Sequence, residues 1–127
     1  MRERFCFDYA IVRVVPRVDR GEFVNAGVIL FSSTAAYLQS RIHLDARKLH
    51  ALAPELEPAL VQPYLDVIPR ICAGGAEAGP IGALPQRARF HWLVAPRSTI
   101  VQTSPMHTGV DHDLDAAVEK LFAKFVR

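Results

Sequence analysis

The sequence predicts an α+β fold, in which a mainly antiparallel sheet of about four strands carries helices packed on one face as a two-layer sandwich. A β-rich hairpin pattern opens the chain over residues 7–32, and residues 114–125 repeat apolar side chains at helical spacing. Strands followed by helices, then a strand and a helix, match neither alternating βαβ units nor an all-β fold. A length of 127 residues is usual for one domain with one core, so residues 1–127 are expected to form a single α+β domain.

The first three strands follow from the opening pattern. Residues 7–15 are apolar at alternating positions on both sides, which predicts a central strand buried on both faces. Pro16 ends this strand, and the turn residues 19–21 precede a second β-rich stretch over residues 23–32, so the two strands are expected to form a wide hairpin. Residues 38–44 alternate between apolar and polar side chains, which predicts a third strand with one wet face.

Two helices are expected after the third strand. Asp45 is suited to cap a short helix that runs to Leu52, and Pro54 separates it from a helical stretch over residues 55–72. Prolines within that stretch predict a kink or a division. Its expected apolar face consists of Leu56, Leu60, Tyr64, Val67, Ile68 and Ile71.

The remaining residues predict one more strand of the sheet and two more helices. Small residues over 73–82 predict a flexible surface connection, and residues 85–94 predict a short helix. Residues 99–103 favour a fourth strand that joins the hairpin sheet. The amphipathic helix over residues 114–125, preceded by Asp113, is expected to pack on the sheet.

Composition narrows the class of protein. A formal charge of +2 is too small to favour nucleic-acid binding, which depends on dense neutralisation of phosphates. The first residues lack the apolar region of a secretion signal, and no apolar run approaches the roughly 20 residues of a membrane helix. Cys6 and Cys72 lack the spacing of a zinc or redox pair and are expected to be buried free thiols. A cytoplasmic protein without membrane contact is therefore expected.

Polar residues concentrate in a hairpin segment, Arg13–Gly27, and in a loop segment, Pro96–Gly109. In the hairpin segment Arg13 shares a face with buried residues, and Glu22 is the nearest candidate for its partner. Arg13, Glu22 and Asn25 are candidate ligand-binding residues. The alternative is a satisfied polar network that fixes the hairpin register, with Gly27 marking a bulge or a close contact.

The loop segment is suited to an anion. Its arginine can bind a carboxylate or phosphate with two hydrogen bonds, its hydroxyls add donors, and its histidine can exchange a proton near neutral pH. Its candidate ligand-binding residues are Arg97, Ser98, Thr99, Gln102, His107 and Thr108. The alternative is that these serines and threonines serve as turn and cap residues.

Known catalytic motifs are missing, so no catalytic residue and no cofactor are assigned. His107 and His112 with Asp111 and Asp113 have a spacing too nonspecific for a metal site, and a helix cap explains the two acids more simply. No metal is expected.

Several motifs resemble those of the bacterial DUF3037 family, a domain of unknown function. They are Tyr9–Pro16, Arg20–Val28, Pro96–Ile100, Gln102–Pro105 and His107–Gly109, in the family's order and spacing over most of the chain. The resemblance implies a bacterial protein and no particular activity. It also implies an accessory role, through an association of the family with a kinase-like protein as partner.

Two functions are weighed. The first is a noncatalytic accessory or binding protein of a bacterial cytosol that holds a partner protein or an anionic ligand through both segments. The alternative is a small enzyme that uses His107 with Arg97 or Arg13 on an anionic substrate. Convergence of the polar residues on a pocket would favour a ligand or catalysis, whereas a contiguous apolar patch beside them would favour a partner protein. The oligomeric state stays open.

Overall fold

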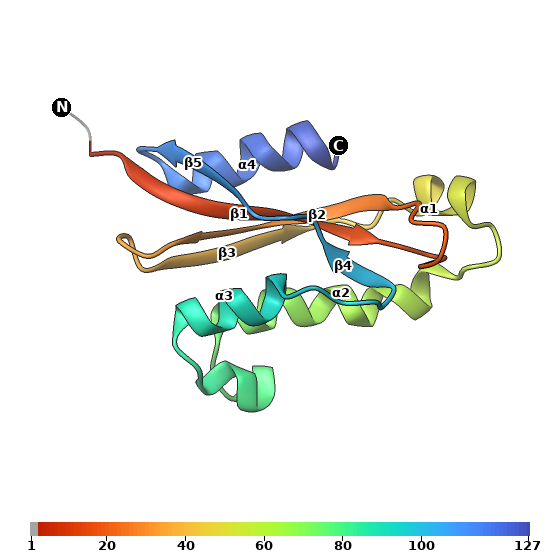
Figure 1. Cartoon of the computed structure of the whole chain (residues 1–127), viewed down its shortest axis with the longest axis horizontal. Helices are drawn as coiled ribbons and strands as arrows, with labels where there is room; N and C mark the ends of the chain where they lie inside the picture. Colours follow the sequence, from red (N-terminus) through yellow and green to blue (C-terminus); the bar gives the residue numbers. More distant parts are fainter. Residues whose placement is uncertain (1–2) are drawn as a thin grey trace.

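A computed structural model describes residues 3–127. Over this range one open antiparallel sheet has the strand order β3-β2-β1-β4, and β5 pairs with the same edge of β1 as β4 (Figure 1). The strands are β1 (Phe5–Val14), β2 (Val24–Ser32), β3 (Tyr37–Ile42), β4 (Val101–Thr103) and β5 (His107–Asp111). The helices are α1 (Ala46–Leu52), α2 (Pro58–Ala73), the 3-10 helix η1 (Ala76–Ala83), α3 (Gln86–Val94) and α4 (Leu114–Phe125). The predicted α+β class with an antiparallel sheet is confirmed.

The helices cover both faces of the sheet, so the expected two-layer arrangement is wrong. Helices α2 and α3 lie on one face and α4 lies on the other (Figure 1). The reason is visible in β1, where Val12 and Ile11 are both buried although they point to opposite faces. A sheet that is apolar on both faces needs a helix layer on each. The chain therefore forms two apolar clusters, separated by one sheet.

One cluster lies between the sheet and α2 and α3, and the other lies under α4. Side chains of the first include Val12, Val14, Ile29, Phe31, Leu49, Leu65 and Phe90. Side chains of the second include Phe7, Ile11, Val28, Leu30, Leu114, Val118 and Phe122. Neighbouring residues of β1 and β2 alternate between the two clusters, so these central strands hold both together.

The β1–β2 hairpin contains the irregularity expected at Gly27. Val12 pairs with Gly27 and Arg13 pairs with Asn25, so β2 carries one extra residue at this point. A Cβ atom on Gly27 would lie 2.5 Å from Cδ1 of Ile42 and 2.7 Å from the carbonyl oxygen of Arg41. The prediction of a bulge or a close contact is confirmed, since both occur at this glycine.

Strands β4 and β5 form one broken edge strand. Between them Ser104 turns inward: its N–H donates to the Ile11 carbonyl at 2.8 Å, and its Oγ accepts from the Ile11 N–H at 2.9 Å. Pro105 follows and interrupts the pairing, because it has no N–H to donate. The fourth strand is confirmed in β4. Strand β5 was not predicted, because an edge strand with mostly exposed side chains lacks an apolar signal.

Helix α2 is continuous over Pro58–Ala73, so its prolines do not divide it. Pro58 occupies its first position, where no N–H is needed, and Pro63 and Pro69 are exposed. Its buried face is Val61, Leu65, Ile68, Ile71 and Cys72. The prediction placed Leu60, Tyr64 and Val67 on that face, and they are exposed instead. The helix carries two apolar stripes side by side, and the sheet covers only one of them.

The predicted helix cap at Asp45 is confirmed, while α2 begins at Pro58 and not at residue 55 as predicted. Asp45 caps α1 by accepting from the N–H groups of Arg47 and Lys48, at 2.9 and 3.2 Å. These bonds, that from Lys48 foremost, hold the pKa of Asp45 below its usual range. Gly74, with a φ of 76°, follows α2. Residues 73–82 were expected to be a flexible connection, and most of them lie instead in η1 (Ala76–Ala83).

Cys72 is buried as expected, and its burial raises the pKa of its thiol to about 11. Cys6 is exposed near the beginning of β1, so the expectation that both thiols are buried is wrong for Cys6. Among residues 3–127, no helix combines the length and the apolar character needed to cross a membrane.

Candidate functional site

The first half of the loop segment forms a wall of a groove. Residues 97–103 face α2 and α3 across it, and the space has a volume of about 560 Å³. Apolar side chains on the other walls are Val18, Tyr64, Val67, Ile68, Trp92 and Leu93. The groove therefore lies on the α2–α3 face, where β4 forms the edge of the sheet.

Several of these apolar side chains are far more exposed than a core residue. Tyr64 is 65% exposed, Val18 43% and Trp92 40%. Leu60, also 65% exposed, lies one turn before Tyr64 on the same stripe of α2. The groove and the uncovered stripe of α2 form one apolar surface, which we call the α2–α3 patch.

Arg97 stands at the edge of this patch and ends helix α3. Its guanidinium donates to the carbonyls of Leu93 at 2.8 Å and Trp92 at 2.5 Å, and its Cζ lies 4.4 Å from the centre of a Trp92 ring. Partial burial lowers the pKa of Arg97. The Arg97 side chain thus bonds the end of α3 and packs against the Trp92 ring.

The neighbouring polar residues shape a turn. Thr99 Oγ1 donates to the Val101 carbonyl at 2.9 Å, and Gln102 Nε2 donates to the Thr99 carbonyl at 2.8 Å. Ser98 is exposed and lines the groove. The contacts of Thr99 and Gln102 are typical of turn residues, which was the alternative to anion binding for this segment. Ser98, Thr99 and Gln102 also form the polar rim of the groove.

His107 and Thr108 do not join this groove. They lie on β5, opposite Tyr9 and Asp8 of β1, and the His107 ring is centred 5.5 Å from that of Tyr9. Thr108 lines a separate hollow that contains Cys6. Ser104 separates the two halves of the loop segment, so the structure divides the predicted site in two.

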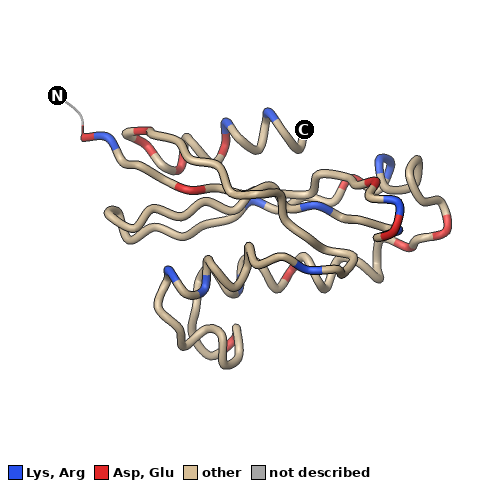
Figure 2. The backbone as a smooth tube through the Cα atoms, in the orientation of Figure 1, with Lys and Arg blue, Asp and Glu red and all other residues tan. Residues whose placement is uncertain are grey.

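The hairpin segment pairs its charges differently from the prediction. Glu22 bonds Arg20, with 2.8 Å to Nε and 3.2 Å to Nη2, so the expected Arg13–Glu22 pair is wrong. Charges of both signs gather around this β1–β2 turn (Figure 2), and Arg17 bonds Glu55 there at 2.5 Å. The Arg20–Glu22 pair lies within the turn, whereas Arg17–Glu55 joins the turn to the segment between α1 and α2.

Arg13 and Asn25 lie on the α4 side of the sheet. Asn25 Nδ2 donates to the Phe125 carbonyl at 2.9 Å, which joins β2 to the end of α4. The guanidinium of Arg13 lies over Phe23, 4.0 Å from the ring centre. Arg13 Nε and Asn25 Oδ1 are buried and have no hydrogen-bond partner in the described residues. The proposed polar network is therefore only partly formed.

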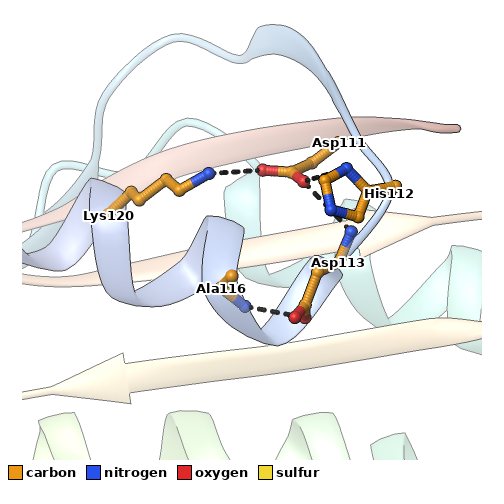
Figure 3. Close-up of polar contacts among 5 residues, drawn as sticks. All are labelled: Asp111, His112, Asp113, Ala116 and Lys120. Carbon is orange, nitrogen blue, oxygen red and sulfur yellow. Dashed lines mark hydrogen bonds and ion pairs between the residues drawn. The ribbon is translucent and has the colours of Figure 1, made fainter.

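The acids before α4 are used in capping (Figure 3). Asp113 accepts from the Ala116 N–H at 3.0 Å, and Asp111 accepts from the Asp113 N–H at 3.0 Å and from Lys120 Nζ at 3.1 Å. These contacts, led by the Asp113 N–H, hold the pKa of Asp111 below its usual range. His112 Nδ1 lies 3.6 Å from Asp111. Residues 3–127 contain no group of three or more His, Cys, Asp or Glu side chains placed to hold a metal ion.

The apolar residues that dominate the groove were not predicted as a site. Tyr64 and Val67 were expected in the core, and Trp92 was given no role. A signal was present: α2 has more apolar residues than one buried face can take, so some had to remain outside.

The fold and the groove define a class of small α+β domain that exposes an apolar surface beside the edge strand of its sheet. A family model described as a protein of unknown function (DUF3037) matches residues 9–126, nearly the whole chain. The chain belongs to this family, which confirms the resemblance found in its motifs. The comparison with curated proteins and the comparison with solved structures gave no match.

Proposed function

We propose that this protein is a noncatalytic binding protein whose α2–α3 patch holds a partner protein. The observation that carries the proposal is the group of exposed apolar side chains at the groove, above all Tyr64 and Trp92. Contiguous apolar surface of this kind marks sites of interaction, because its exposure to water is unfavourable.

The extent of the patch favours a protein over a small molecule. A small ligand within the groove would cover Tyr64 and Trp92 but would leave Leu60, a helical turn away, in water. A partner that lies along α2 would cover the whole stripe. Tyrosine, tryptophan and arginine are also the residue types that contribute most to protein interfaces. Tyr64, Trp92 and Arg97 meet at this patch.

The polar rim supports the same function. Ser98 and Thr99 are exposed beside the apolar floor, where they can form hydrogen bonds that fix the orientation of a partner. The accessory role in a bacterial cytosol belongs to this proposal, and the kinase-like protein that the sequence resemblance implies is its first candidate partner. An enzyme that pairs His107 with Arg97 is not favoured, because His107 lies outside the groove that Arg97 lines.

Photo-crosslinking in the native cells tests the proposal. A photoreactive phenylalanine analogue replaces Tyr64, and in a control it replaces Ala123, an exposed residue of α4 on the opposite face. We expect a discrete crosslinked protein from position 64 and none from position 123. The additional change Val67→Asp should reduce the yield at least about tenfold, because a buried unpaired charge opposes binding.

The matched change Ala123→Asp should leave the crosslink from position 64 unchanged. The same products from both positions, or no product from position 64, would contradict the proposal. So would a crosslink that survives Val67→Asp, provided that the variant shows the circular dichroism spectrum of the wild type.

A further inference from the structure

We propose that Arg13, stacked on Phe23, forms a second binding site that receives a carboxylate group. The site lies on the α4 face of the sheet and is separate from the α2–α3 patch. It takes a single planar anion, either a free carboxylic acid or the side chain of an aspartate or glutamate.

The position of Arg13 follows from the alternation of β1. Phe7 and Ile11 belong to the cluster under α4, and Arg13 continues the same side of the strand. Its partner in the sheet, Asn25, bonds the end of α4. Phe23 comes two residues before Asn25 and therefore shares this side, in agreement with its contact with Arg13.

Arg13 differs from the other arginines of limited exposure. Arg17 bonds a carboxylate, whereas Arg89 and Arg97 bond backbone carbonyls. Arg13 is half-buried like Arg17 and Arg97, yet its buried Nε has no acceptor and its guanidinium forms no hydrogen bond or ion pair with residues 3–127. An arginine carries five N–H donors, and a guanidinium that is partly removed from water normally uses several of them.

The Nε atom of Arg13 is buried, so a ligand is expected to meet the terminal Nη1 and Nη2 groups of the guanidinium. Phe23 covers one flat face of the guanidinium at 4.0 Å and is itself 43% exposed, so the pair lies at the surface. The N–H groups of a guanidinium lie in its plane, where the ring does not block them. Glu22, the carboxylate expected from the sequence to pair with Arg13, is bonded to Arg20 and does not compete.

A carboxylate fits this arrangement better than a phosphate. Two parallel N–H groups of arginine match the two oxygens of a carboxylate in one plane. One guanidinium also balances one negative charge, whereas a phosphate near neutral pH carries more charge and usually needs further donors. Asn25 adds no positive charge: one N–H of its amide donates to Phe125, and its buried oxygen is an acceptor.

Nuclear magnetic resonance titration of the whole chain tests this site. Acetate is added at constant ionic strength against chloride, and the backbone amide signals of Phe23 and Asn25 are followed. We expect these signals to shift with acetate in a saturable way and to stay in place with chloride. Equal shifts with both salts, or none with either, would overturn the proposal.

Substitutions test whether the acetate-dependent shifts of the amide signals depend on Arg13. Arg13→Lys keeps the charge but loses the paired donors, so we expect acetate to bind at least about tenfold more weakly. If that variant does not fold, Phe23→Leu removes the stacking surface and should also weaken binding. Arg20→Lys, a change at an exposed arginine of the same hairpin, should have no effect. Unaltered binding in a folded Arg13→Lys protein would reject the site.

A second titration separates the two sources of the carboxylate. It uses a capped tripeptide with a central glutamate, and the same peptide with glutamine as its control. Tighter binding of the glutamate peptide than of acetate would assign the site to a protein side chain, whereas tighter binding of acetate would assign it to a free acid. Equal binding of the glutamate and glutamine peptides would contradict recognition of the charge.

Discussion

The arginines of limited exposure serve different purposes in this protein. Arg89 is buried and closes α2, Arg97 is half-buried and closes α3, and Arg13 lies over Phe23 with unused donors. The difference lies in the groups around each guanidinium, which are backbone carbonyls for Arg89 and Arg97 and an aromatic ring for Arg13. The carbonyls at the end of a helix have no partner within the helix, so an arginine that reaches them satisfies groups that would otherwise lose hydrogen bonds.

Gly27 provides a test of backbone packing at a single residue. The change Gly27→Ala should lower the free energy of unfolding by about 2 kcal/mol, because its Cβ would overlap Ile42 and the Arg41 carbonyl. Urea denaturation followed by circular dichroism measures the change. Ala36→Gly is a suitable comparison, because Ala36 has a φ of 50°, a conformation that favours glycine. It should leave stability unchanged or raise it, and equal losses in both variants would contradict this account.

Helix α2 shows how an element depends on its neighbours. Its end is held by Arg89 of α3, whose Nη1 donates to the carbonyls of Ile71 at 2.8 Å and Cys72 at 2.7 Å. Nε of the same residue donates to the Leu84 carbonyl at 2.9 Å. Gly74 allows this approach, because a Cβ there would lie 2.8 Å from the guanidinium. One side chain thus joins α2, the segment after η1, and α3.

We predict that Arg89→Met lowers the free energy of unfolding by about 3 kcal/mol, because it leaves buried carbonyls without donors. Urea denaturation measures the loss. The control Arg70→Met changes an exposed arginine of α2 and should cost less than about 0.5 kcal/mol. Similar losses in the two variants would show that Arg89 does not hold the helix end in the way described.

The molecule as a whole depends on one sheet that joins two apolar clusters. Ile29 and Leu30 are consecutive residues of β2, both fully buried, and they belong to opposite clusters. Because both clusters pack on the same strands, unfolding of the sheet would disrupt both of them. The two clusters are therefore expected to unfold together, as in a cooperative small protein.

The change Phe122→Ala tests this coupling. It removes a buried side chain under α4 and should lower the free energy of unfolding by about 3 to 4 kcal/mol. Trp92, the one tryptophan of the chain, lies on the opposite side of the sheet and reports on the other cluster by fluorescence. We expect its urea midpoint to fall together with that from circular dichroism. A Trp92 midpoint that stayed at the wild-type value would show two independent units.

Much of the fold was predictable, because its signals are local. The alternation over residues 7–15 predicted a strand buried on both faces, and Asp45 and Asp113 marked helix starts that the structure confirms. The missed strand β5 has mostly exposed side chains and gains its structure from pairing with β1. The continuity of α2 through its prolines likewise depends on packing against the sheet, which outweighs local propensity.

The candidate site was less predictable, because it depends on which surfaces remain uncovered. Sequence alone determined the α+β class, the family and the two polar segments, since residue order and spacing carry these features directly. Tertiary structure decided that Tyr64 and Trp92 face solvent, that His107 lies apart from Arg97, and that Arg13 has no carboxylate partner. The physical reason is that exposure and pairing are set by contacts between residues far apart in the chain, and no local pattern records them.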